Sequence, residues 1–183
     1  MRALAFAWFN SPLLLDEDQA IAAALGEVDG VDAGALVAAL DSPEVTEAYE
    51  ADKADTRTAA GSAAELQGKT ATTDGPVRFT APSIVFAVNG TRLVAGGFQP
   101  VEAYDVLVAN LEPGLSREPV PPSPAPLLQY FTDGLSTQEV AALMTEGNDP
   151  PDRQAAEAGL LELVASGDAI RRPVGDDALW QAS

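Results

Sequence analysis

The residue types that could carry out chemistry in this chain are few, because cysteine and histidine are both absent. Without cysteine there is no thiolate nucleophile, no disulfide and no iron–sulfur ligand. Without histidine the usual general base and the commonest metal ligand are missing, which excludes zinc, haem and Ser-His-Asp chemistry. We therefore predict no catalytic residue, no metal site and no cofactor for this chain.

Two acidic clusters are the remaining candidates for binding a divalent cation. They are Asp16-Glu17-Asp18 and Asp176-Asp177. A hard cation needs several oxygens that converge from defined spacings, and neither cluster has such a pattern. Acids just before a periodic apolar segment instead favour a helix N-terminus, where they interact with the helix dipole and cap free N–H groups. We assign both clusters to caps and turns.

A loop followed by two strands is the most specific pattern in the chain. Thr80-Ala81-Pro82 ends the loop, and two apolar stretches follow at residues 83–88 and 91–95. An Asn-Gly pair joins them, and this pair favours a two-residue hairpin turn because both residues tolerate positive φ. We predict an antiparallel hairpin.

The segment after the hairpin is predicted to cover one of its faces. Gly96-Gly97 fits a strand-end bulge or turn better than a cradle for a ligand. Residues 100–111 begin with proline and form a helix with one apolar stripe. The stripe consists of Val101, Tyr104, Leu107, Val108 and Leu111.

The first 61 residues are predicted to be helical. Residues 2–9 are apolar and contain Phe6, Trp8 and Phe9, and such a stripe is more often core than a binding surface. The alternative is a substrate groove between this segment and the hairpin. Further helices are expected at residues 16–25, 32–40 and 42–61, and a loop at residues 62–78.

A proline-rich linker separates this part from a smaller C-terminal domain. Residues 112–126 contain six prolines in fifteen positions, which is typical of a semi-rigid extended linker. Residues 127–183 then have the order of a winged helix, with Trp180 as core. The expected helices are 127–131, 136–144 and 151–165, followed by the strands AIRRPV and ALWQA.

The charge of the chain limits its partners. The 28 acidic residues exceed the 10 basic ones, which gives a net charge of −18 and disfavours nucleic acid and anionic membranes. The candidate recognition helix at residues 152–165 has one base and three acids, so we do not expect DNA binding. There is no transmembrane run and no signal-peptide pattern, and we expect the chain in the cytoplasm.

Two stretches together resemble the DsbA-type thiol–disulfide oxidoreductases. The hairpin with Ala81-Pro82 is similar to the second half of a thioredoxin fold, where a cis proline precedes an antiparallel strand. The stretch from RALAFAWF to DAGALVAAL resembles the helical insertion of the family, and GGFQPVEAYDVLVANL its closing strand-to-helix step. The likeness covers roughly residues 1–111. It implies that Pro82 is cis and that Thr80, Ala81 and Pro82 face a bound thiol peptide.

The resemblance implies an α+β, mostly helical fold. A partial thioredoxin-like (DsbA-like) domain would span residues 1–111, with a helical insertion at 1–61 and the hairpin and final helix at 79–111. A winged-helix-like domain at 127–183 would follow. The Cys-X-X-Cys unit of the family precedes its insertion and is absent here. Three alternatives would complete the sheet: a longer gene product, a second copy, or coverage of the hairpin edge by residues 67–79.

Two hypotheses for function follow from these observations. The first is a DsbA-like oxidoreductase-family protein, truncated or degenerate, which is inactive by itself because it has no redox cysteine. The alternative is a non-enzymatic protein-interaction or dimerisation module. The expected partners are a protein, a thiol peptide or a second copy, and neither nucleic acid nor membrane.

Overall fold

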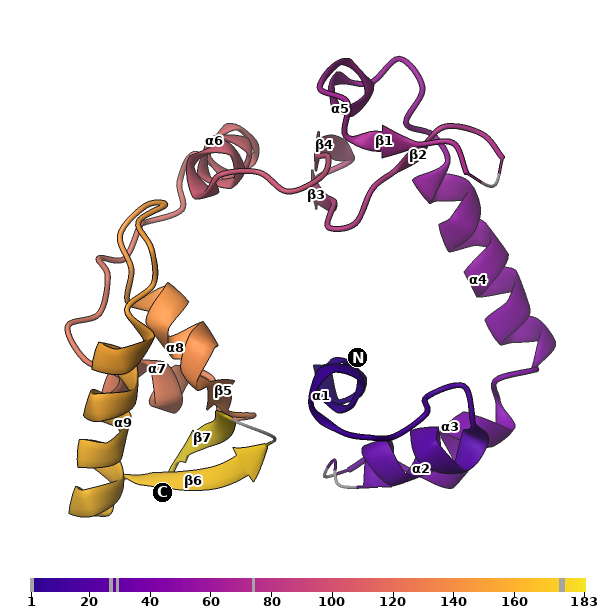
Figure 1. The fold of residues 1–183 in the computed structure, drawn as a ribbon. Helices are drawn as coiled ribbons and strands as arrows, with labels where there is room; N and C mark the ends of the chain where they lie inside the picture. Colours follow the sequence, from indigo (N-terminus) through magenta and orange to yellow (C-terminus); the bar gives the residue numbers. More distant parts are fainter. Residues whose placement is uncertain (1, 27, 29, 74, 175–176) are drawn as a thin grey trace. The chain divides into compact units, whose positions relative to one another are not determined.

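The structure is a computed structural model that describes residues 2–26, 28, 30–73, 75–174 and 177–183. It is an α+β chain of helices and small antiparallel sheets (Figure 1). Two compact units are present: a first unit of Met1–Ala39 with Glu118–Ser183, and a second unit of Leu40–Arg117. Each unit is described by itself. The division into domains at residues 112–126 stays a prediction.

The N-terminal part of the first unit is helical, as predicted. It contains α1 (Arg2–Asn10), α2 (Asp18–Gly26) and α3 (Ala33–Ala38), and α2 packs against both neighbours. The acidic cluster lies at the start of α2, as expected from the helix dipole. The carboxylate of Asp32 caps α3 by accepting a hydrogen bond from the backbone N–H of Ala35 at 2.9 Å.

The C-terminal part of the first unit combines three helices with a three-stranded sheet (Figure 1). The strand order is β5-β7-β6, all antiparallel. The predicted capping box at Ser136 and Glu139 is confirmed, and Gly167 ends α9 with φ of 86°. The elements are α7 (Ala125–Tyr130), β5 (Leu135–Ser136), α8 (Thr137–Leu143), α9 (Arg153–Ser166), β6 (Ala169–Val174) and β7 (Asp177–Ala182).

This C-terminal part contains the main apolar core. Trp180 and Leu160 are fully buried in it, and Trp180 was predicted to have this role. Side chains from α7, α8, α9 and all three strands contribute, so each of these elements buries one apolar face against the others. The buried members are Leu127, Leu128, Leu135, Val140, Ala141, Ala156, Leu160, Ala169, Ala178 and Trp180.

The second unit contains short helices and two separate two-stranded sheets. The predicted Ser42 cap is confirmed, because its hydroxyl accepts a hydrogen bond from the N–H of Val45 at 3.3 Å. The elements are α4 (Pro43–Thr56), α5 (Ala63–Leu66), β1 (Thr70–Ala71), β2 (Arg78–Phe79), β3 (Ile84–Val88), β4 (Thr91–Ala95) and α6 (Val101–Leu111).

The predicted hairpin is confirmed as β3 and β4. Their antiparallel register pairs Ile84 with Ala95 and Val88 with Thr91. The turn residues Asn89 and Gly90 have φ of 49° and 81°, so both occupy the left-handed region that an Asn-Gly turn supplies. The predicted position of the turn is therefore correct.

Residues 62–78 were predicted to be a loop, and this prediction is wrong in part. They contain α5, β1 and the first residue of β2. These elements are two to four residues long, and such lengths have no measurable hydrophobic period in a sequence. β1 pairs with β2, so in the described residues the segment 67–79 does not pair with the edge of the β3–β4 hairpin.

Helix α6 packs against both strands of the hairpin. The Phe86 and Tyr104 rings lie 6.4 Å apart between their centroids, which identifies the strand face that α6 covers. Pro100 was predicted to be the first helical residue, and it is the N-cap instead, so the helix begins one residue later than predicted. No helix within the described ranges is long and apolar enough to cross a bilayer.

Candidate functional site

The loop at Thr80, Ala81 and Pro82 is held in place by its neighbours. The Thr80 hydroxyl donates to the carbonyl of Lys69 at 3.0 Å. The hydroxyl of Ser83 donates to the Thr80 carbonyl and accepts the N–H of Gly97 at 2.8 Å. Ala81 and Pro82 are exposed, and the peptide bond between them is cis, as predicted. Their predicted contact with a thiol peptide stays a prediction.

Gly96 and Gly97 have a packing role beside this loop. A Cβ added at Gly96 would lie 2.3 Å from the Cβ of Ala64, so only glycine lets α5 approach β4 this closely. Gly97 has φ of 65°, and a Cβ there would lie 2.9 Å from the side chain of Lys69. Packing and backbone conformation explain both glycines without a ligand.

The face of the hairpin opposite α6, here called the open face, is partly exposed. It presents Val85 and Val94, which are 43% and 37% exposed and lie directly across from each other. Arg92 lies on the same face and donates to a carboxylate oxygen of Asp55 in α4 at 2.8 Å. This hydrogen bond, with the attraction between the charges, lowers the pKa of Asp55 below its ordinary 3.8. Both groups are therefore charged at neutral pH.

The aromatic residues of α1 are not core. Trp8 is 67% exposed and Phe9 is 81% exposed, so the core interpretation is wrong for both. Phe6 of the same helix is half-buried, with the Arg2 guanidinium 4.9 Å from its ring centroid. The alternative groove would join α1 to the hairpin, which belongs to the other compact unit, and it stays a prediction.

Arg2 forms a bidentate ion pair with Glu139 of α8. The two guanidinium nitrogens lie 2.5 and 2.6 Å from the carboxylate oxygens, and Nη2 also donates to the Gly134 carbonyl at 2.7 Å. Burial raises the pKa of Glu139, but the hydrogen bonds from Arg2 and Ser136 outweigh burial, and the pKa is lowered from 4.5. The pair connects the first helix to the C-terminal elements of the same unit.

A buried chain of hydrogen bonds connects α8 to β7. The Trp180 indole N–H donates to the Thr137 hydroxyl at 2.9 Å, and that hydroxyl donates to a carboxylate oxygen of Asp177. The other oxygen of Asp177 lies 3.3 Å from the Arg153 guanidinium. Thr137 is only 1% exposed, so its hydroxyl has no access to water as a substitute partner.

These contacts account for Asp177 of the second acidic cluster. Asp177 is bound by Thr137, Arg153 and the backbone N–H of Ala178, which is a structural role. Asp176 lies outside the described residues. Among the residues that the structure describes, no group of three or more acidic side chains could hold a metal ion.

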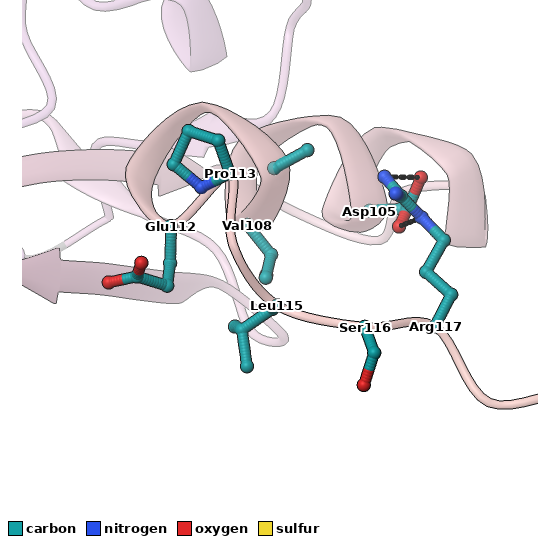
Figure 2. A pocket seen from close by; sticks show the side chains of 8 residues that line it. Asp105, Val108, Glu112, Pro113, Leu115, Ser116 and Arg117 are labelled. Atoms are coloured by element: carbon teal, nitrogen blue, oxygen red, sulfur yellow. Dashed lines mark hydrogen bonds and ion pairs between the residues drawn. The ribbon is translucent and has the colours of Figure 1, made fainter.

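A hollow of about 190 Å³ lies along the C-terminal half of α6 (Figure 2). Apolar side chains such as Val108 and Leu115 line it, and an ion pair between Arg117 and Asp105 closes one end at 2.7 and 2.9 Å. The hydrogen bond from Arg117 lowers the pKa of Asp105 below its ordinary 3.8, so this carboxylate is a poor proton acceptor at neutral pH. The ion pair of Arg117 with Asp105 connects the start of the proline-rich segment to α6.

Sequence reasoning missed two of the residues that organise these sites. Thr137 follows the N-cap of a helix, and a threonine there is expected to face solvent, so only the position of β7 reveals its role. The partner of Arg2 lies 137 residues away, and no local pattern predicts such a pair. The capping box did identify Glu139 as a carboxylate held by backbone.

No family model matches the chain, and no curated protein sequence matches it.

Proposed function

We propose that residues 79–111 are the hairpin-and-helix part of a DsbA-like, thioredoxin-type fold that binds polypeptide without carrying out thiol chemistry. The observation that carries this proposal is the order of elements in the second unit. The exposed Ala81-Pro82 loop is followed by β3 and β4, and α6 packs across one face of the two strands. The outer edge of β3 has no paired strand in the described residues.

The proposed binding mode is the addition of an extended strand beside β3. Backbone groups at a sheet edge bind an extended peptide regardless of its sequence, and side chains on the open face add selectivity. Ala81 and Pro82 are exposed at the start of the same edge. The proposed partner class is therefore a protein segment or thiol peptide in extended conformation.

The absence of cysteine makes the chain redox-silent in this proposal. The test is an insulin-reduction assay on the purified chain together with an NMR titration of the β3 amides with an extended thiol peptide. We expect no turnover above buffer, and shifts at Val85 and Ala87. Turnover would contradict the redox-silent role, and unshifted β3 amides would contradict peptide binding.

We further propose that residues 127–183 form a winged-helix-like module that contacts protein and not DNA. The strand order β5-β7-β6, with α7 before β5 and α8 and α9 between β5 and β6, supports the winged-helix assignment. Two of its few bases already have partners: Arg153 pairs with Asp177 at 3.3 Å, and the Arg171 guanidinium lies 5.5 Å from the Trp180 ring centroid.

The test for this module is fluorescence anisotropy with a labelled DNA duplex at low salt, where phosphate contacts are strongest. We expect no saturable rise in anisotropy. Binding that weakens steeply with added salt would contradict the protein-contact assignment.

The second candidate function is a non-enzymatic dimerisation module. The specific observation in its favour is that β3 has no charge, no proline and no glycine, although the chain carries a net charge of −18. Light scattering separates the two candidates, because a dimerisation module changes its mass with concentration and a peptide-binding monomer does not.

A further inference from the structure

The turn of the β3–β4 hairpin contains an asparagine that is directly followed by a glycine. Asn89 and Gly90 are both exposed, and their φ angles of 49° and 81° place them in the left-handed region. Within the residues that the structure describes, neither the side-chain amide of Asn89 nor the backbone N–H of Gly90 has a hydrogen-bond partner. The two neighbouring groups that can react with each other are therefore both open to water.

Gly90 leaves its own backbone nitrogen accessible. A side chain at this position would crowd the nitrogen as it approaches the side-chain carbonyl carbon of the preceding residue, and glycine has no side chain. A Cβ built at Gly90 has no atom within 4 Å, so the space around the residue is filled by solvent. Base from the solvent can therefore remove the proton of the Gly90 N–H.

The other asparagines of the chain lie in less reactive surroundings. They are Asn10, Asn110 and Asn148, and each is followed by a residue with a side chain. The residues after Asn10 and Asn148 already donate their backbone N–H groups to carbonyls, at 3.1 and 3.3 Å. The side chain of Asn110 donates to the Val106 carbonyl at 2.7 Å. Asn89 is the least protected asparagine of the four.

We propose that Asn89 is a site of spontaneous deamidation, in which its side chain and the Gly90 nitrogen form a cyclic imide that water then opens. The deprotonated Gly90 nitrogen attacks the side-chain carbonyl carbon of Asn89, and a C–N bond forms. The bond from that carbon to the amide nitrogen breaks, and this nitrogen takes up a proton and leaves as ammonia. The product is a succinimide ring in the backbone, and the step needs no oxidant or reductant.

Water opens the ring in one of two ways. Hydrolysis of the bond to the former side-chain carbonyl gives aspartate at position 89. Hydrolysis of the bond to the backbone carbonyl gives isoaspartate, in which the chain continues through the former side chain. Overall one water is consumed and one ammonia is released. Either product carries a carboxylate at neutral pH, so it adds one negative charge to a chain of net charge −18.

The isoaspartate product changes the hairpin itself. The turn has two residues, with Val88 directly opposite Thr91, and the length of such a loop fixes the register of the strands. Isoaspartate adds one methylene to the backbone of this loop, so the two-residue turn no longer closes in the same form. We expect the Val88–Thr91 pair to open first. Aspartate at the same position adds the charge without the methylene, and it is tolerated in this type of turn.

The test is peptide mapping by mass spectrometry during incubation of the full chain in mildly alkaline buffer. The tryptic peptide of residues 79–92 contains Asn89. It should show the mass change from amide to acid on the order of tenfold faster than the peptides that contain the other asparagines. Asn89→Gly is the matched control, because a Gly-Gly pair supports the same turn and has no amide to lose. Its 79–92 peptide should keep its mass.

Three results would overturn the proposal. The first is an Asn89 amide that stays intact in the folded chain while the urea-unfolded chain loses it, because the turn would then protect the residue. The second is a rate at another asparagine that equals or exceeds the rate at Asn89. The third is aspartate as the sole product, because only the cyclic intermediate leads to isoaspartate.

The effect on the hairpin has its own measurement. Anion exchange separates the modified chain by its additional charge, and NMR then reports the backbone amides of β3 and β4. In the isoaspartyl form we expect the Val88 and Thr91 amides to lose their cross-strand contact, whereas Asn89→Asp should retain it. Retention in both would contradict the opening of the turn. Conversion of Asn89 is measured without any peptide, so its failure leaves the proposed peptide binding at β3 standing.

Discussion

At the scale of single residues, the best-defined polar contacts of the chain are the hydrogen bonds of Thr137, and their role is to stabilise the fold. Thr137 accepts from the indole of Trp180 and donates to Asp177, and each of its partners lies on β7. Buried polar groups that lose a partner cost more free energy than the bond itself contributes. The hydroxyl of Thr137 is thus expected to matter far more than its small volume suggests.

Thr137→Val tests this role. The substitution leaves the indole N–H without its acceptor and Asp177 without a donor, so we expect a loss of about 1–3 kcal/mol in the free energy of unfolding. Urea denaturation followed by Trp180 fluorescence measures it, with Trp8→Phe as background because Trp8 is the other tryptophan. Thr137→Ser retains the hydroxyl and should recover most of the loss. Equal stability of the Val and Ser variants would contradict the role.

Single residues were predictable from the sequence where their role is local. The Ser136 and Glu139 capping box, the Asn89-Gly90 turn and the Gly167 helix end all follow from short patterns, and the structure confirms them. Thr137 and Arg2 were not predictable, because their partners lie 43 and 137 residues away. Burial of an aromatic residue was predicted correctly for Trp180 and wrongly for Trp8 and Phe9, since composition alone does not reveal which apolar segments meet.

At the scale of elements, close approach of α5 to β4 depends on Gly96. Gly96→Ala places a Cβ 2.3 Å from that of Ala64, so one of the two elements must move. We expect a loss of about 1–3 kcal/mol, as for other overpacked sites. Thermal unfolding measures it, and Gly114→Ala is the matched control because the nearest atom to its added Cβ is 3.6 Å away. An unchanged midpoint in Gly96→Ala would contradict the close packing.

The Arg2–Glu139 pair makes the contact between α1 and α8 sensitive to acid. The pKa of Glu139 is lowered in the folded chain from 4.5, so the pair stabilises the fold above that pH and the contribution is lost as pH falls through the folded pKa. Glu139→Gln should therefore flatten the decline of the melting temperature as the pH falls below about 4.5. Arg2→Gln should flatten it less, because Ser136 still holds the carboxylate. A decline unchanged by Glu139→Gln would contradict this linkage.

Elements were predictable in proportion to their length. The helices α4, α6 and α9 were predicted from period and caps, with errors of a few residues at their ends. The prediction missed α5, β1, β2 and β5, which are two to four residues long and are held by their neighbours rather than by their own pattern. The β3–β4 hairpin was predictable because turn chemistry and alternation coincide.

At the scale of the whole molecule, charge is the dominant feature. The net charge of −18 is spread over a chain in which the ion pairs Arg2–Glu139, Arg92–Asp55 and Arg117–Asp105 are exposed or only partly buried. Exposed pairs contribute little to stability. Repulsion among the excess acids should outweigh these pairs. Salt screens both the repulsion among the acids and the attraction within the ion pairs. The larger of the two determines whether the melting temperature rises or falls when salt is added.

We therefore expect added NaCl to stabilise the chain, with a rise in melting temperature of about 3–6 °C between low and 0.5 M salt. Helix α4 allows a sharp control, because Glu44, Glu47 and Glu50 follow each other at three-residue spacing on an exposed surface. Glu47→Lys replaces the repulsion of Glu47 from Glu44 and Glu50 with attraction to both. The substitution should therefore raise the melting temperature at low salt and reduce the additional rise that NaCl produces. A melting temperature that falls with salt would mean that the Arg92–Asp55 and Arg117–Asp105 pairs outweigh the excess acids, contrary to this expectation.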